Sequence, residues 1–129
     1  MNKNTEPVDL YCRKPAKALT KKHRDNFTIG IHTTLTLVAE YFTHPAQVNK
    51  PHMLHRLTVT GQWEIWKIPV MVKGLRPGQW PRLWIGVPLG TPVIVPLVLD
   101  EHKSGYDDNT NQATAESRMR EYTLKNLTC

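Results

Sequence analysis

Residues 61–103 read GQWEIWKIPVMVKGLRPGQWPRLWIGVPLGTPVIVPLVLDEHK, and this stretch decides the expected fold. It holds all 4 tryptophans of the chain, and its apolar residues alternate with polar or cationic ones over several runs. Alternation with a period of two is typical of β-strands, because successive side chains point to opposite faces of a sheet. Clusters of Gly and Pro separate the runs, as turns require. The stretch therefore predicts consecutive antiparallel strands.

Pro69 and Pro96 lie inside expected strands and qualify the place of those strands in the sheet. Pro69 falls within the strand expected after the turn at residues 60–61, and Pro96 interrupts the last strand. Proline cannot donate a ladder hydrogen bond, so we expect a sheet edge or a bulge at Pro69. In full, the sequence predicts strands at residues 54–59, 62–72, 80–87 and 93–99.

The N-terminal third predicts a short strand followed by two helices. Residues 8–12 alternate apolar and polar, as a strand would. Pro15 opens a run of Ala, Leu and Lys, which suits a helix because a helix tolerates proline in its first turn. Residues 27–42 are ambiguous: apolar side chains recur at helical spacing, whereas the threonines favour a strand. Their length without an internal turn favours a helix, which we adopt.

The C-terminal part predicts one more helix. Asn109 or Thr110 can cap its start. With 129 residues the chain can build one hydrophobic core, so we expect a single domain over residues 1–129, with residues 1–7 and 123–129 flexible. The order of elements predicts an α+β fold: an N-terminal strand, two helices, an antiparallel sheet of about four strands and a C-terminal helix. We expect the helices on one face of that sheet.

The charge of the chain indicates an anionic partner. There are 17 Lys and Arg against 11 Asp and Glu, which give a net charge of +6 and a pI near 9.5. Nucleic acid, an acidic protein or a membrane surface would suit this balance, and solubility alone is the alternative. The surplus is uneven: residues 1–26 carry seven cations against three anions, residues 51–83 five against one, and residues 100–129 four against six.

Composition also bears on the compartment. No run approaches the roughly 18 apolar residues that span a bilayer, and the first 26 residues are too polar for a signal peptide. Cys12 and Cys129 are too few for a disulfide framework. We therefore expect a reduced, cytoplasmic protein with no membrane partner.

Several segments, in this order, carry a resemblance to a known family. They are HRL at residues 55–57, GQWEIWKI at 61–68, PRLWI at 81–85, DEHK at 100–103 and the closing helix at 113–122. Together with the element order, they resemble the RelE/ParE superfamily of toxins from type II toxin–antitoxin systems. The turns here are longer and richer in proline than is usual there. Glu101 also stands where that family often has a tyrosine, and Ile68 where it often has a second cation.

The resemblance implies a function. Its RelE-, HigB- and YoeB-like members are metal-independent mRNA endoribonucleases that cut mRNA on the ribosome and inhibit translation. The implied partners are mRNA, the ribosome and a cognate antitoxin protein, with no cofactor. Two alternatives stay open: a ParE-like toxin that lacks nuclease activity and binds a protein such as gyrase, and a non-toxic nucleic-acid-binding protein of a phage or plasmid.

Three residues are candidates for catalysis, since RNA cleavage without a metal needs a base, an acid and cations that stabilise the phosphate. His102 is the candidate acid or base, and the alternative is a surface histidine at a strand end. Arg82 is the candidate phosphate clamp, and the alternative is an arginine whose stem covers the core. Glu64 is the candidate base beside His102, and the alternative is a cross-strand ion pair.

Further residues are secondary candidates for RNA contact: Lys67, Lys73, Arg76, Lys103 and Tyr106. In a strand Trp80, Arg82 and Trp84 would share a face, so Arg82 could lie between two stacking rings. Most of the tryptophans are nevertheless expected in the core, because each can bury a large area. The histidines form no convincing metal-binding set, so we predict no metal site.

Overall fold

The computed structural model describes residues 4–101 and 107–126 of the chain. In this part it contains three α-helices and five β-strands, and the α+β class is confirmed. The elements are β1 (Asn4–Thr5), α1 (Asp9–His23), α2 (Asp25–Thr43), β2 (His55–Val59), β3 (Trp63–Pro69), β4 (Arg82–Pro88), β5 (Val93–Asp100) and α3 (Asp108–Asn126), with a short 3-10 turn at Pro77–Gln79.

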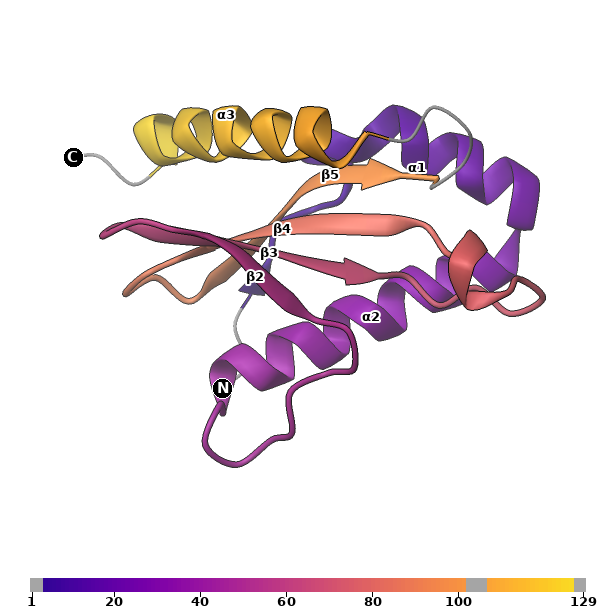
Figure 1. Ribbon diagram of the computed structural model, residues 1–129, viewed down its shortest axis with the longest axis horizontal. Helices are drawn as coiled ribbons and strands as arrows, with labels where there is room; N and C mark the ends of the chain where they lie inside the picture. Colours follow the sequence, from indigo (N-terminus) through magenta and orange to yellow (C-terminus); the bar gives the residue numbers. More distant parts are fainter. Residues whose placement is uncertain (1–3, 102–106, 127–129) are drawn as a thin grey trace.

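The strands form one mixed sheet in the order β1-β5-β4-β3-β2 (Figure 1). The last four strands of the sequence are antiparallel neighbours, as predicted. β1 adds a fifth strand that runs parallel to β5, with Asn4 opposite Val93 and Thr5 opposite Ile94. The expectation of about four antiparallel strands therefore missed the parallel edge strand.

The strand expected at residues 8–12 is wrong, because α1 begins at Asp9. The backbone N–H groups of Leu10 and Cys12 donate to the carbonyls of Pro7 and Val8 instead of to a neighbouring strand. Cys12, at φ −117° and ψ 23°, breaks the helix, so Pro15 lies in the first turn of the regular segment that follows. A five-residue alternation is too short to exclude a helical turn.

The helix expected at residues 27–42 is confirmed, since α2 runs from Asp25 to Thr43. Its threonines, which favoured a strand in the sequence, bond within the helix. The hydroxyls of Thr34, Thr36 and Thr43 each donate to the carbonyl four residues earlier, at 2.7 to 2.8 Å. The apolar side chains at helical spacing pack against the sheet.

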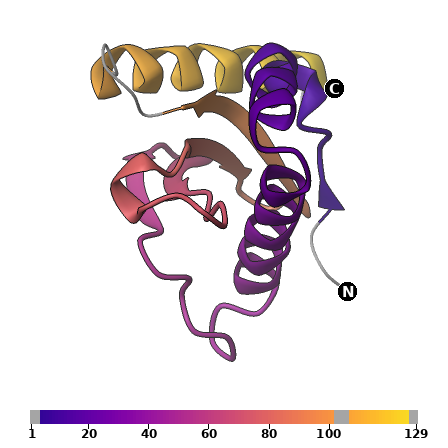
Figure 2. The same cartoon turned by 90° about the vertical axis from the view of Figure 1, so that its right-hand side faces the viewer.

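Helices cover both faces of the sheet, so the expectation of helices on one face is wrong. Figure 1 shows α3 on one side of the strands and α2 on the other, and Figure 2 shows α1 and α2 from the side. Along β4, Leu83, Ile85 and Val87 enter the core beneath α1 and α2, whereas Trp84 enters the core beneath α3. The alternation of one strand thus serves two cores. The face of α3 that packs on the sheet consists of Ala115, Met119 and Tyr122.

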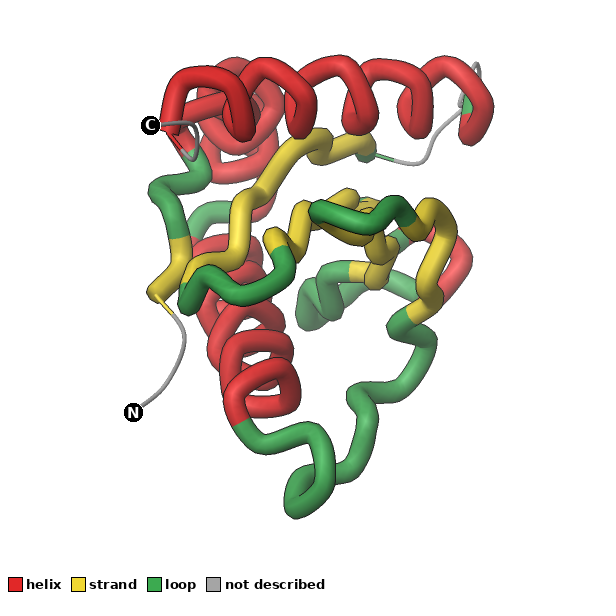
Figure 3. Tube along the Cα trace, turned by 90° about the vertical axis from the view of Figure 1, so that its left-hand side faces the viewer, coloured by secondary structure: helices red, strands yellow, loops and turns green. Residues whose placement is uncertain are grey.

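The prolines sit where ladder bonds are not required. β2 pairs with β3 only as far as Lys67, so Pro69 lies beyond that pairing, at a local edge of the sheet. Pro96 lies at a shift of register between β4 and β5. Figure 3 shows the long loops that join α2 to β2 and β3 to β4.

The start of α3 is capped by a residue that the sequence reading passed over. Asp107 Oδ1 accepts hydrogen bonds from the backbone N–H groups of Asn109 and Thr110, at 3.0 and 3.3 Å, and Asp107 Oδ2 accepts one from the Thr110 hydroxyl at 2.7 Å. Asp107 is therefore the cap, and the predicted caps Asn109 and Thr110 are donors to it. These bonds, above all those from Thr110, lower the pKa of the Asp107 carboxyl.

Candidate functional site

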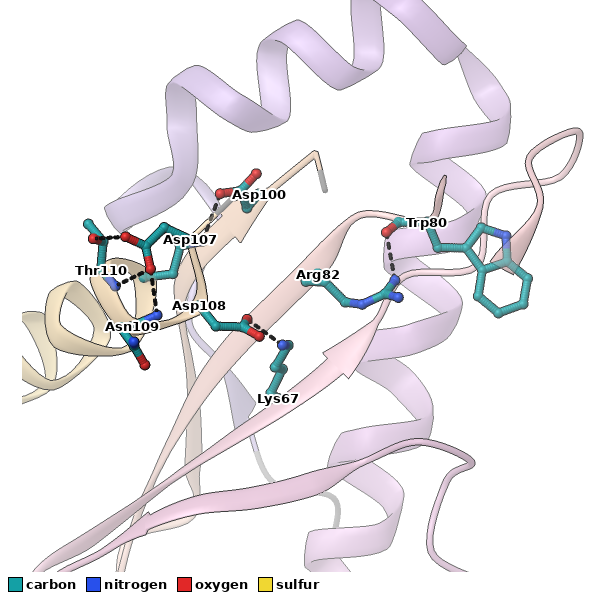
Figure 4. A network of polar contacts seen from close by, with 9 residues as sticks. Lys67, Trp80, Arg82, Asp100, Asp107, Asp108, Asn109 and Thr110 are labelled. Carbon is teal, nitrogen blue, oxygen red and sulfur yellow. Dashed lines mark hydrogen bonds and ion pairs between the residues drawn. The ribbon is translucent and has the colours of Figure 1, made fainter. Parts of the chain in front are cut away.

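Polar side chains from three strands of the sheet and from the start of α3 meet at one end of the molecule. Arg82 opens β4 and pairs in register with Asp100, which ends β5. Lys67 lies on β3, two residues before Pro69, the partner of Arg82. Asp108 begins α3 beside them (Figure 4). We call Lys67, Arg82, Asp100 and Asp108 the Arg82 corner.

Arg82 is the cation of this corner with donors to spare. Its guanidinium Nη1 donates to the backbone carbonyl of Trp80 at 2.7 Å, and the side chain is half-buried. A guanidinium has five N–H donors, and within the described residues the Trp80 carbonyl is its one acceptor. The remaining donors can bind an anion such as a phosphate in a two-pronged geometry.

Lys67 is held by protein groups. Its Nζ lies 2.5 Å from Asp108 Oδ1, and its side chain is only 19% exposed. The same nitrogen lies 4.9 Å from the centroid of the Trp84 ring. Lys67 could contact RNA only if its ion pair with Asp108 broke. Its main role in the structure is to anchor the start of α3.

The tryptophans are mostly core, as predicted. Trp63, Trp66 and Trp84 are 6%, 9% and 0% exposed, which leaves no ring face for stacking on a base. Trp80 precedes β4, packs against the core beneath α1 and α2, and donates its Nε1–H to the Leu75 carbonyl at 3.2 Å. Arg82 therefore does not lie between two stacking tryptophans, and that expectation is wrong.

Glu64 lies at the other end of the sheet. It pairs with Val87, five residues along β4 from Arg82, which at about 3.3 Å per residue is roughly 17 Å away. Its Oε1 accepts from Trp66 Nε1–H at 3.0 Å, and its Oε2 lies 3.6 Å from Arg56 Nη1. The cross-strand ion pair, the alternative in the sequence reading, is what the structure contains. Glu64 is not brought to Arg82.

The remaining predicted residues divide into two groups. Lys73 and Arg76 are exposed in the loop between β3 and β4, where the Lys73 carbonyl accepts from Asn26 and the Arg76 backbone N–H donates to Gln79. His102, Lys103 and Tyr106 lie outside the described residues. The described chain stops at Glu101, next to Asp100, and resumes at Asp107, next to Asp108, so it leaves and re-enters at the Arg82 corner.

Two aspartates of the corner were not singled out from the sequence. Asp100 Oδ2 accepts from the Asn111 side chain at 2.7 Å, and Asp108 pairs with Lys67, which is 41 residues away along the chain. No local pattern could predict the pair of Asp108 and Lys67. The position of Asp100 could have been predicted, because a residue two places after Val98 lies on the same face of the strand. With two cations and two aspartates among its described members, the corner carries no net surplus of positive charge.

The corner can bind a phosphate through Arg82 and can orient α3. Within residues 4–101 and 107–126, no group of three or more His, Cys, Asp and Glu side chains is arranged to hold a metal ion. No helix in the same ranges is both long and apolar enough to cross a membrane.

The fold and the corner define a three-layer α+β domain with an arginine at the end of its sheet. No known protein family, curated protein or solved structure matches the chain.

Proposed function

We propose that this chain is a RelE-like toxin of a type II toxin–antitoxin pair, a ribosome-dependent, metal-independent endoribonuclease that cuts mRNA and so inhibits translation. The observation that supports it best is the element order of strand, two helices, antiparallel strands and helix, with the half-buried Arg82 at the sheet end where the chain leads on to His102. A cytoplasmic location and a cognate antitoxin belong to the same proposal.

The chemistry needs no metal. The 2′-hydroxyl of the message attacks the adjacent phosphate, its proton goes to a base, and the 5′-oxygen leaves with a proton from an acid, so a cyclic phosphate and a free 5′-hydroxyl result. The spare donors of Arg82 stabilise the charge that builds on the phosphate oxygens. His102 is the proposed proton-transfer residue on the strength of the sequence alone. Glu64 takes no part in this scheme, because it is paired with Arg56 at the far end of the sheet.

Induced expression in a bacterial host tests the proposal. The wild-type chain is compared with R82A, H102A and, as a matched control, E64Q, each checked for folding by circular dichroism. We expect growth arrest with cuts at fixed codon positions of mRNA, mapped by primer extension, and at least about 100-fold less cleavage for R82A and H102A. E64Q should cleave as the wild type does.

Other results decide against the nuclease. Growth arrest with intact mRNA and a DNA-damage response would support a ParE-like toxin that binds gyrase. Absence of arrest would contradict both kinds of toxin and leave a non-toxic nucleic-acid-binding protein. Loss of cleavage in E64Q, with the fold retained, would overturn the assignment of Glu64 as a structural residue.

A further inference from the structure

A run of cations lies on α1 and at its junction with α2, outside the Arg82 corner. Residues 9–25 hold six Lys and Arg against two Asp, a net charge of +4 in a chain whose total is +6. Four of these cations line one shallow hollow of about 680 Å³: Arg13, Lys17, Lys21 and Arg24. We call these four residues the α1 ridge.

The spacing of the ridge follows from the helix. Arg13, Lys17 and Lys21 recur every four residues in the regular part of α1, so they stand on one face, about 6 Å apart along the axis. Arg24 continues the row at the junction with α2. A row of cations with this repeat is comparable in spacing to successive phosphates of a nucleic-acid strand.

The cations of the ridge form no ion pair with the described residues. Asp9 and Asp25 also line the hollow, so its charged lining of four cations and two anions has a net charge of +2. This contrasts with the Arg82 corner, where Lys67 is already paired with Asp108.

The chemistry of the lining distinguishes between polyanions. Between the cations lie Ala16 and Thr20, and no bulky apolar or aromatic side chain lines the hollow. A helix that binds a membrane surface needs such side chains to enter the lipid, so a bilayer fits poorly. The lining has no Asn or Gln that could pair with adenine, and its Lys and Arg side chains suit phosphate oxygens, the groups that take a large share of protein–nucleic acid hydrogen bonds.

Arg24 adds an independent observation. Its backbone has φ 55° and ψ −132°, a region that glycine adopts readily and other residues rarely do. A cation thus occupies a position where glycine would relieve strain, and residues in strained backbone conformations cluster at functional sites. Its side chain completes the ridge at the turn between α1 and α2.

We propose that the α1 ridge binds the sugar–phosphate backbone of folded RNA without regard to sequence. The choice of RNA rests on the proposed function, since an enzyme that cuts mRNA on the ribosome meets ribosomal RNA. Another side of α1 borders the corner, where Lys22 Nζ lies 3.4 Å from Glu101 Oε2. The protein can therefore hold structured RNA on the ridge while the message lies at the Arg82 corner.

Fluorescence anisotropy with a labelled RNA duplex tests the ridge. The full-length wild type is compared with K17E/K21E, with the milder K17Q/K21Q, and with K50E/K125E, which changes the net charge by the same amount as K17E/K21E at exposed positions elsewhere. We expect K17E/K21E to bind at least about 10-fold more weakly at low salt, and the slope of log affinity against log salt to fall by about two. K17Q/K21Q should lie between, and K50E/K125E should stay within about twofold of the wild type.

Several outcomes would overturn the ridge. Equal losses of RNA affinity in K17E/K21E and K50E/K125E would show that the binding depends on net charge alone and not on the ridge. Ridge-dependent binding of equal strength to a DNA duplex of the same sequence would remove the assignment to RNA. Ridge-dependent binding to phosphatidylserine vesicles without RNA binding would make it a membrane site. The two proposals fail separately. A wild type that binds RNA through the ridge but does not cleave mRNA would contradict only the nuclease, and a wild type that cleaves mRNA without binding through the ridge would contradict only the ridge. R82A, which keeps the ridge, should still bind the duplex.

Discussion

The ammonium nitrogen of Lys67 lies 4.9 Å from the ring centroid of Trp84, on the sheet face that α3 covers, and Asp108 closes over it. A cation that sequence reasoning assigns to RNA is thus placed between a fully buried ring and the first residue of a helix. The contact joins β3, β4 and α3 at a single point. Lys67 therefore contributes to the stability of the site that surrounds it.

We expect K67A to destabilise the fold by about 1–2 kcal/mol, because both the ion pair with Asp108 and the contact with Trp84 are lost from a mostly buried position. K73A, at an exposed lysine whose backbone carbonyl accepts a hydrogen bond from Asn26, should change stability by less than about 0.5 kcal/mol. Urea denaturation measures both. Equal stabilities for the two variants would contradict the anchoring role.

The same change, arginine to glycine, should affect stability in opposite directions at Arg24, between α1 and α2, and at Arg13, within α1. R24G should stabilise the fold by about 1 kcal/mol, since glycine accepts φ 55° without strain, while it weakens RNA binding by the ridge. R13G should destabilise by about 1 kcal/mol, because it puts glycine into a helix. Thermal and urea denaturation provide the measurements. If R24G is the less stable of the two, Arg24 is not strained.

Close packing around two glycines predicts which alanine substitution destabilises the fold more. A Cβ at Gly30 would lie 2.2 Å from the Met71 carbonyl oxygen, and one at Gly86 would lie 2.4 Å from Met119 Sδ. The backbone at Met71 cannot move aside, whereas the Met119 side chain can rotate. G86A should therefore destabilise the fold by about 1–3 kcal/mol, and G30A should destabilise it more. G61A, with open space around it, should be nearly neutral. The reverse order of G30A and G86A in urea unfolding would contradict this packing.

Tyr122 predicts an alkaline limit to stability. Burial and a hydrogen bond to Glu6 raise the pKa of the Tyr122 phenol to about 12, above its ordinary value of 10.0. The folded state thus favours the neutral phenol, so its contribution is full below about pH 10 and is lost as the pH rises through about 12. The difference in Tm between wild type and Y122F, followed by circular dichroism, should shrink over this range. A constant difference would show that the Tyr122 pKa is not raised.

Short-range sequence patterns predicted much of the fold. The alternation on either side of the turn at residues 60–61 predicted four antiparallel strands, and the length and helical spacing of residues 27–42 outweighed their threonines. These features could be predicted because backbone hydrogen bonds and side-chain periods act within one turn or one strand. The five residues at 8–12 were too few for such a pattern to separate strand from helix.

By itself, the sequence determined the periodicity of each element, the burial of most tryptophans and the excess of cations near the N-terminus. Only the tertiary structure decided which of those elements meet. It parted Glu64 from Arg82, paired Lys67 with Asp108 and turned one face of α1 into a row of cations. The physical reason is that contacts between distant residues depend on strand register and on which sheet face a helix covers. Those follow from the packing of both cores together, and no local pattern encodes them.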